Sequence, residues 1–361
     1  MNPAWERVIN HTNRQRNPEK QNEREDQKTK QSLQEICEAQ IRNETAMRKV
    51  AKIEYEPVLK LCAMMHVNAG REVNADRIRE CSGILKSRAG LFSNFRGTLQ
   101  RVILTKMALA NDPASYIDDV MDVYGKLKSD HKLPGEMLAM AATTIVDHCP
   151  EERRTEIVEK TRQTYAMLKK QHPFLTDESD MSLVALMIMA GKDPVQAAEE
   201  AERLFQAMKN DYKIRSDVAQ SAAMVLALSD KPADRKLQAF FGLYDACKAA
   251  KHETAKDKAM VIYAAFADAD YDLNETAASI GEVDNWLKGQ KGYGLLSLGT
   301  SERRLFAASM VLKDMQAGGA AAAASATNAI TQAIIEELVL ILVMIILTGI
   351  IVSTTVSNSF S

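Results

Sequence analysis

Apolar residues recur along most of this chain at the three- and four-residue spacing of amphipathic helices. The first such helix begins at about Lys30, and Pro57 suits the first turn of the next one. The apolar stripe of the first helix consists of Leu33, Ile36, Cys37 and Ile41. Strands have little support, because aromatic residues are only 6% of the chain.

From Leu91 onward the pattern repeats with a period of about 40 residues. An aromatic residue lies near the end of every second predicted helix. These markers are Tyr124, Tyr165, Phe205, Tyr244 and Trp286. The helices between them, such as EMLAMAATTIVDH and SLVALMIMAG, are apolar nearly all round, which predicts inner helices. This organisation indicates a helix-pair array of the solenoid type. A single irregular helical domain is the alternative.

The predicted fold class is therefore all-α, an irregular helix-pair repeat array (α-solenoid-like) that ends in a hydrophobic helix. The predicted segments are a polar, disordered N-terminus (1–29), N-terminal helices (30–90), a helical repeat body (91–316), an Ala/Gly-rich spacer (317–332) and the hydrophobic helix (333–357).

The hydrophobic C-terminal helix is a candidate membrane segment. No charged side chain occurs from Leu338 to Ser361, and a helix needs about 20 apolar residues to cross a bilayer. The predicted membrane segment is marked by Leu338, Leu342, Ile346 and Ile350. No Lys or Arg flanks it closely, so the usual orientation signal is missing. A tail anchor is favoured over a helix buried against the body or a second copy, and over a pore-forming segment.

Charge and composition narrow the classes of partner. Charged residues are 26% of the chain and the net charge is −2, so no global attraction to nucleic acid is expected. The first twenty residues lack the apolar run of a secretory signal. We therefore expect a cytoplasmic body that the C-terminal tail anchors to the cell membrane.

Three stretches resemble the bacterial DUF4003 family, which is uncharacterised and known mainly from Firmicutes. They are Phe92-Ser-Asn-Phe-Arg96, Tyr124-Gly-Lys-Leu-Lys128 and His172-Pro-Phe-Leu-Thr176. The resemblance covers about residues 50–312. It implies a helical bacterial protein of unassigned function and carries over no catalytic residue. The uncharged run after Leu338 looks like a departure from the family.

Few residues suggest specific chemistry. Arg96 lies beside Phe92 and Phe95 in a basic stretch, and could form an ion pair in a groove. His131 and His172 occupy equivalent positions in successive repeats, and acidic residues follow His172, which is one arrangement for acid–base work. The sequence DADYDLNE resembles half of a calcium loop but lacks the required glycine and final glutamate, so a capped turn is expected. We predict no cofactor and no metal.

These observations favour a non-enzymatic scaffold that binds a protein or peptide partner. Two alternatives remain: an enzyme whose site is assembled across repeats from His131, His172 and acidic turns, and a membrane-active protein whose tail is the effector. Convergence of the histidines and carboxylates in a pocket would favour the enzyme.

Overall fold

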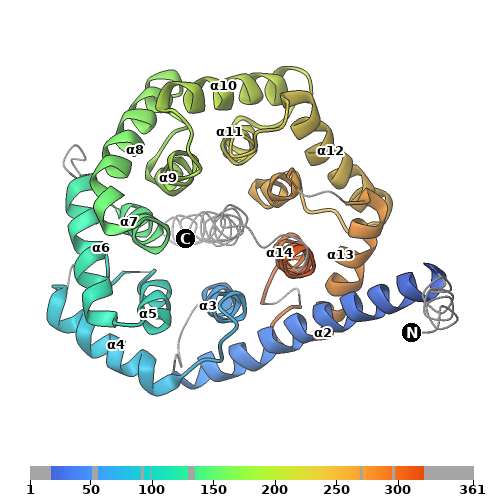
Figure 1. The fold of residues 1–361 in the computed structure, drawn as a ribbon, viewed down its shortest axis with the longest axis horizontal. Coiled ribbons are helices and arrows are strands. Elements are labelled where there is room, and N and C mark those ends of the chain that lie inside the picture. The colour runs from blue at the N-terminus through green and yellow to red at the C-terminus, as the bar shows by residue number, and fades with distance from the viewer. Residues whose placement is uncertain are drawn as a thin grey trace, which may run out of the picture.

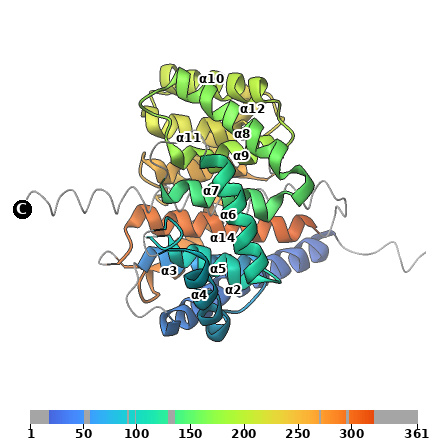
Figure 2. The same cartoon turned by 90° about the vertical axis from the view of Figure 1, so that its left-hand side faces the viewer.

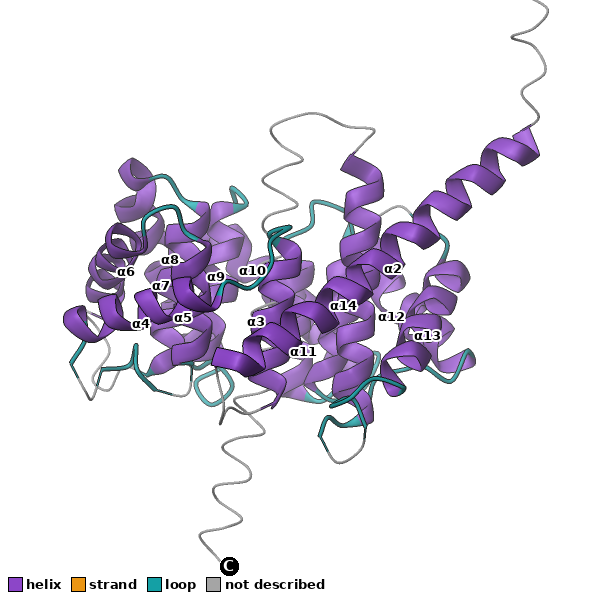
Figure 3. Ribbon diagram, turned by 90° about the horizontal axis from the view of Figure 1, so that it is seen from below, coloured by secondary structure: helices purple, strands orange, loops and turns teal. Residues whose placement is uncertain are grey.

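The computed structural model confirms the all-α prediction. Its described residues are 18–50, 56–90, 93–97, 99–128, 135–268, 271–294 and 297–320. Within these ranges every regular element is a helix, as Figure 3 shows from below. The predicted membrane segment and His131 lie outside them. No helix of the described part of the chain is both long enough and apolar enough to cross a membrane.

The described helices form a closed ring of two layers (Figure 1). The outer helices are α2 (Pro18–Val50), α4 (Ala75–Arg88), α6 (Pro113–Lys128), α8 (Glu151–Gln171), α10 (Pro194–Asn210), α12 (Ala233–Ala249) and α13 (Leu273–Lys288). The inner elements are α3 (Glu56–Asn68), α5 (Gln100–Leu109), α7 (Glu136–His148), α9 (Met181–Met189), α11 (Ser216–Leu226), the 3₁₀ element η2 (Lys258–Phe266) and α14 (Thr300–Ala320). The short 3₁₀ element η1 (Glu178–Asp180) precedes α9.

The predicted alternation of helices matches the two layers. The five aromatic markers lie on outer helices, and the segments that are apolar all round are inner elements. The residues three positions after the first four markers are all buried, namely Leu127, Leu168, Met208 and Cys247. These four outer helices therefore turn the same face toward the inner layer, which is why the period is visible in the sequence.

Two element boundaries differ from the predicted ones. Helix α2 begins at Pro18, well before Lys30, so residues 18–29 of the segment predicted to be disordered are helical. Proline suits a first turn, and the Glu, Gln and Lys residues that follow are good helix formers. Helix α14 reaches Ala320 and so takes in the start of the predicted spacer.

The array closes on itself, whereas a solenoid-type array leaves its two ends free. Helix α14, in the last pair, packs against α2, in the first pair. A buried ionic cluster, here called the seam, lies at this closure. It consists of Gln40, Glu44 and Arg48 from α2, Glu56 and Lys60 from α3, and Tyr293 from the loop before α14. The Lys60 and Glu44 side chains are 0% and 1% exposed.

Within the seam, Lys60 carries the central charge. Its Nζ lies 2.9 Å from Glu44 Oε2 and 3.8 Å from the centroid of the Tyr293 ring. The Tyr293 hydroxyl donates to the other Glu44 oxygen. Gly292 has a φ of +85°, and a Cβ there would lie 3.0 Å from Lys60 Nζ, so this turn needs glycine. A buried lysine is tolerated here because a carboxylate and a ring face replace its hydration.

Figure 1 shows the inner helices end-on and the outer helices from the side, and Figure 2 shows α14 lying parallel to the ring axis. Contacts between the starts of neighbouring inner elements, and between their ends, show that these elements run in the same direction. Their N-termini therefore share one face of the ring, where carboxylates of one repeat hold the preceding repeat. The Glu136 carboxylate accepts from Leu99 N (2.8 Å), and the Glu178 carboxylate accepts from Gly135 N (2.6 Å). A Cβ at Gly97 would lie 1.9 Å from Glu136 Oε1. Acidic residues also suit the positive ends of these helices.

On the opposite face, cations bond the carbonyl ends of the next inner element. These contacts are Arg71 to Leu109 O (2.8 Å), Lys192 to Ser229 O (3.2 Å), Lys231 to Ala267 O (2.9 Å) and Lys313 to Asn68 O (3.1 Å). The last of them joins the final inner helix to the first. A cation at the negative end of a helix stabilises it, so these contacts fix the repeats and close the ring.

Candidate functional site

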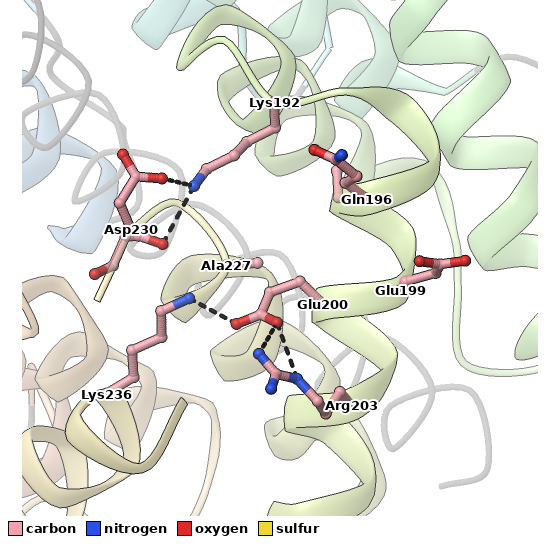
Figure 4. Close-up of a pocket in the computed structure, with 10 residues that line it drawn as sticks. Lys192, Gln196, Glu199, Glu200, Arg203, Ala227, Asp230 and Lys236 are labelled. Atoms are coloured by element: carbon pink, nitrogen blue, oxygen red, sulfur yellow. Dashed lines mark hydrogen bonds and ion pairs between the residues drawn. The ribbon is translucent and has the colours of Figure 1, made fainter. Parts of the chain in front are cut away.

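A charged hollow of about 500 Å³ lies between outer helices α10 and α12, above the end of inner helix α11. Figure 4 shows the side chains that surround it. Three cations and three carboxylates line it, together with uncharged Gln196 and Ser229. The charged residues are Lys192, Arg203, Lys236, Glu199, Glu200 and Asp230. We call this the charged hollow.

The turn between α9 and α10 places Lys192 at the rim. Gly191 adopts a φ of +86°, and Lys192 N donates to Met187 O, which ends α9 in a tight turn. Asp193 then caps α10 by accepting from the backbone N–H groups of Val195 and Gln196. This sequence of a helix end, a glycine and a cap turns the Lys192 side chain toward the end of α11.

Glu200 is the centre of the hollow. Its carboxylate accepts from Lys236 Nζ at 2.7 Å and from Arg203 Nε at 3.0 Å. Burial alone would raise the pKa of Glu200, but the hydrogen bonds from Lys236 and Arg203 outweigh it and hold that pKa below its usual value. Lys236 is buried, whereas Glu200 keeps partial access to water. Glu200 is therefore ionised and reachable from solvent.

A second ion pair borders the hollow. Lys192 Nζ donates to the Asp230 carboxylate, and this hydrogen bond lowers the pKa of Asp230. The Asp230 side chain is 97% exposed. Glu199 is also exposed, and no ion pair of Glu199 with another described residue is present. The hollow therefore offers charges of both signs to a polar ligand. The lowered pKa values of Glu200 and Asp230 keep these two carboxylates ionised, which is a poor state for a general acid near neutral pH.

The predicted residue Arg96 lies away from the hollow. It sits in the turn before α5 and is half-buried, and no ion pair from it to a described residue is present. Phe95 packs edge-on against Tyr124 with 5.0 Å between the ring centroids. The predicted basic groove at Arg96 therefore has no described partner.

His172 has a carboxylate partner, but a different one from those predicted. Its Nε2 contacts the Glu202 carboxylate of α10, and its ring lies 4.4 Å from that of Phe205. Asp177 caps η1, and Glu178 holds Gly135. A second histidine repeats the arrangement, since His252 Nδ1 lies 2.9 Å from Asp284. Both histidine–carboxylate contacts join one repeat to the next, which indicates that they hold neighbouring repeats together. His131 lies outside the described residues, so the predicted pairing of His131 with His172 stays a prediction.

The acidic stretch DADYDLNE holds helix ends. Asp272 caps α13 by accepting from the backbone N–H groups of Asn274 and Glu275 at 2.8 and 2.9 Å. Asp268 accepts from the Ser229 hydroxyl, and Asp270 lies outside the described residues. Among the described side chains, no group of three or more His, Cys, Asp or Glu is placed to hold a metal ion.

Sequence reasoning missed the hollow, although a signal for it exists. Its central pair, Glu200 and Lys236, and its rim pair, Lys192 and Asp230, are each separated by nearly one repeat. Lys106 and Asp147 form a pair of the same kind, with 2.5 Å between Nζ and Oδ2. Opposite charges one period apart face each other across neighbouring repeats. A search for such pairs would have found these contacts.

The ring and its ion-paired joints define an all-helical protein of stacked helix pairs. The chain matches the DUF4003 family, described as "Protein of unknown function (DUF4003)", over residues 44–341, and it belongs to that family. The match is wider at both ends than the resemblance found in the sequence, and it leaves residues 342–361 outside. No curated protein and no solved structure matches the chain.

Proposed function

We propose that this protein is a non-enzymatic binding scaffold, and that its charged hollow takes a protein or peptide segment carrying charges of both signs. The observation that supports this is the hollow itself. Six ionisable side chains of both signs surround about 500 Å³ of open space. Such a surface favours a ligand whose charges are complementary to its own. It disfavours a segment whose charges all have the same sign, because bringing like charges together costs several kcal/mol.

The hollow also favours binding over catalysis. Its carboxylates Glu200 and Asp230 have lowered pKa values, so they act as acceptors of hydrogen bonds from a ligand. Its charged side chains come from helices α10 and α12 and from the turns before α10 and after α11, and Lys236 and Arg203 hold the central Glu200 in place. Fixed charges reduce the ordering cost of binding. The predicted membrane segment lies outside the described residues, so the proposal is confined to the ring.

The test uses two arginine substitutions on adjacent residues of α10. Gln196 lines the hollow, so Gln196→Arg would fill it, while Val195 is exposed and outside the lining, so Val195→Arg is the matched control. A displayed library of random peptides is selected against the full chain. We expect the wild type and Val195→Arg to enrich the same peptides with mixed charge, and Gln196→Arg to lose at least about tenfold in affinity. Enrichment that survives Gln196→Arg would show that the hollow is not the binding site.

A further inference from the structure

Exposed lysines gather where four successive outer helices end. They lie in the last turns of α8, α10, α12 and α13 and in the turns that follow, at Lys170, Lys209, Lys213, Lys248, Lys251, Lys256, Lys288 and Lys291. None of the eight forms an ion pair with another described residue. Because these turns lead into the inner elements, the lysines lie toward the face of the ring where the inner elements start. We call this surface the basic face.

The carboxylates of the same turns leave most of this positive charge unbalanced. The turns that follow the four helices contain Asp177, Asp211, Glu253 and Asp257. Asp177 and Asp257 cap the two 3₁₀ elements, and Glu253 lies 3.7 Å from Arg304. Asp211 has no ion pair with a described residue. Although the whole chain has a net charge of −2, the basic face is therefore locally positive.

Two lysines of the basic face occupy positions that usually favour glycine. Lys213 and Lys251 have left-handed backbone conformations, with φ of 56° and 63°. A Cβ makes this conformation unfavourable, so helix ends of this kind usually carry glycine. The ends of inner helices α3 and α9 do so, at Gly70 and Gly191. The turns after α10 and α12 therefore do not require a lysine side chain, and both lysines are free to contact a ligand.

The basic face also presents aromatic rings to solvent. Phe174, in the turn after α8, is fully exposed. Its turn is held in place, because Lys169 Nζ donates to Pro173 O at 2.6 Å. In the next turn along the ring, Tyr212 is exposed on one side and stacks on Phe241 with 3.9 Å between the ring centroids. An apolar ring beside unpaired cations is typical of a surface that meets lipid headgroups.

We propose that the basic face docks the ring on the surface of a membrane that contains anionic lipids. The lysines are spread over four successive turns and none of them lines the charged hollow, so they suit an extended anionic surface better than a ligand in a pocket. Each lysine near such a surface adds to the attraction, and Phe174 enters the headgroup layer. An acidic protein would satisfy the lysines, but it would also need an apolar pocket for Phe174.

This docking is compatible with binding in the charged hollow. The hollow lies at the end of α11, whereas the basic face lies where the inner elements start. The two surfaces therefore lie on opposite faces of the ring. Loss of one binding activity leaves the other measurable.

The first test removes the two left-handed lysines from the full chain. Lys213→Gly combined with Lys251→Gly takes away two charges and keeps the turns, so the midpoint of thermal unfolding should stay within about 2 °C of the wild type. Binding is measured by co-sedimentation with vesicles of phosphatidylcholine, with and without phosphatidylglycerol, at low salt. We expect the variant to bind the vesicles with phosphatidylglycerol at least about tenfold more weakly. Arg79→Gln combined with Arg235→Gln is the charge-matched control, because both arginines are exposed at the starts of outer helices.

The second test removes the exposed ring. Phe174→Ala should not affect folding, because the side chain is fully exposed, and should weaken vesicle binding at least about fivefold. Val195→Ala removes an exposed apolar side chain at the start of α10 and is the control. A wild type that does not bind the vesicles, or that binds them equally without phosphatidylglycerol, would overturn the proposal. Binding that depends on the lysines and not on Phe174 would assign the basic face to an acidic protein, and would also overturn it.

Discussion

The seam and the charged hollow are both ion-pair clusters that lie at a junction between helix pairs, and they differ in their access to water. In the seam, the Lys60 and Glu44 side chains are 0% and 1% exposed. In the hollow, the Lys236 side chain is 3% exposed, its partner Glu200 is 22% exposed, and Asp230 is 97% exposed. Breaking a pair leaves a charge without solvent only where both partners are buried. We therefore expect the seam to control stability and the hollow to be available for binding.

The largest effect is expected at the seam. Lys60→Met removes the cation and leaves Glu44 buried, so the free energy of unfolding should fall by about 3–5 kcal/mol. Chemical denaturation of the full chain measures this change. Lys49→Met on α2 is the matched control, because Lys49 is exposed, and it should cost less than about 0.5 kcal/mol.

A double variant separates the buried charge from lost packing. Lys60→Met combined with Glu44→Gln removes both charges, so it should be more stable than Lys60→Met alone. If the double variant is the less stable of the two, the carboxylate is not the source of the loss, and the seam would be a packing contact rather than an ion pair.

A smaller effect is expected in the hollow. Lys236→Met leaves Glu200 bound to Arg203 and partly solvated, so the expected loss is about 1–2 kcal/mol, less than half that of Lys60→Met. Lys248→Met on the exposed side of the same helix is the control. Equal losses for Lys60→Met and Lys236→Met in denaturant titrations would contradict the difference drawn between the two clusters.

Asp180 extends the comparison to a buried carboxylate bonded to amides. It accepts from Asp177 N and Gln220 Nε2, each at 3.0 Å, and burial, with Asp177 nearby, raises the pKa of Asp180 from 3.8 to about 7. The folded protein thus keeps a proton that the unfolded chain releases. That stabilising contribution is complete below about pH 4 and is lost as the pH rises toward 7.

Asp180→Asn should remove this pH dependence. We expect the variant to unfold about 2–4 °C higher than the wild type at pH 8 and at nearly the same temperature at pH 4. Thermal scans across this range, plotted as variant minus wild type, give the result. A difference that is constant with pH would show that Asp180 stays ionised when folded, as Glu200 of the hollow is expected to do because its pKa is lowered.

The sequence predicts what is local and periodic. Helix type and the inner or outer position follow from apolar spacing and from aromatic markers such as Tyr124 and Phe205, because each repeat packs mainly on its neighbours. Closure of the ring could not be predicted this way. It depends on the small rotation per repeat, summed around the array, and on contacts such as Tyr293 to Glu44, which are 249 residues apart. The hollow was missed because its charges resemble a solvated helix face unless they are compared one period apart.

The smallest effect on stability is expected at Asp230. Asp230→Asn removes an exposed partner of Lys192, and exposed ion pairs contribute about 0–1 kcal/mol, so the free energy of unfolding should change by less than about 0.5 kcal/mol. Lys192 keeps its hydrogen bond to Ser229 O at 3.2 Å, which holds it at the rim. The same substitution removes one of three carboxylates of the hollow, so binding of the selected mixed-charge peptides should weaken about three- to tenfold, measured at low salt. Weaker binding with unchanged stability would separate the hollow from the seam, whereas a variant that loses stability and keeps its peptide affinity would assign Asp230 to the joints that hold the ring.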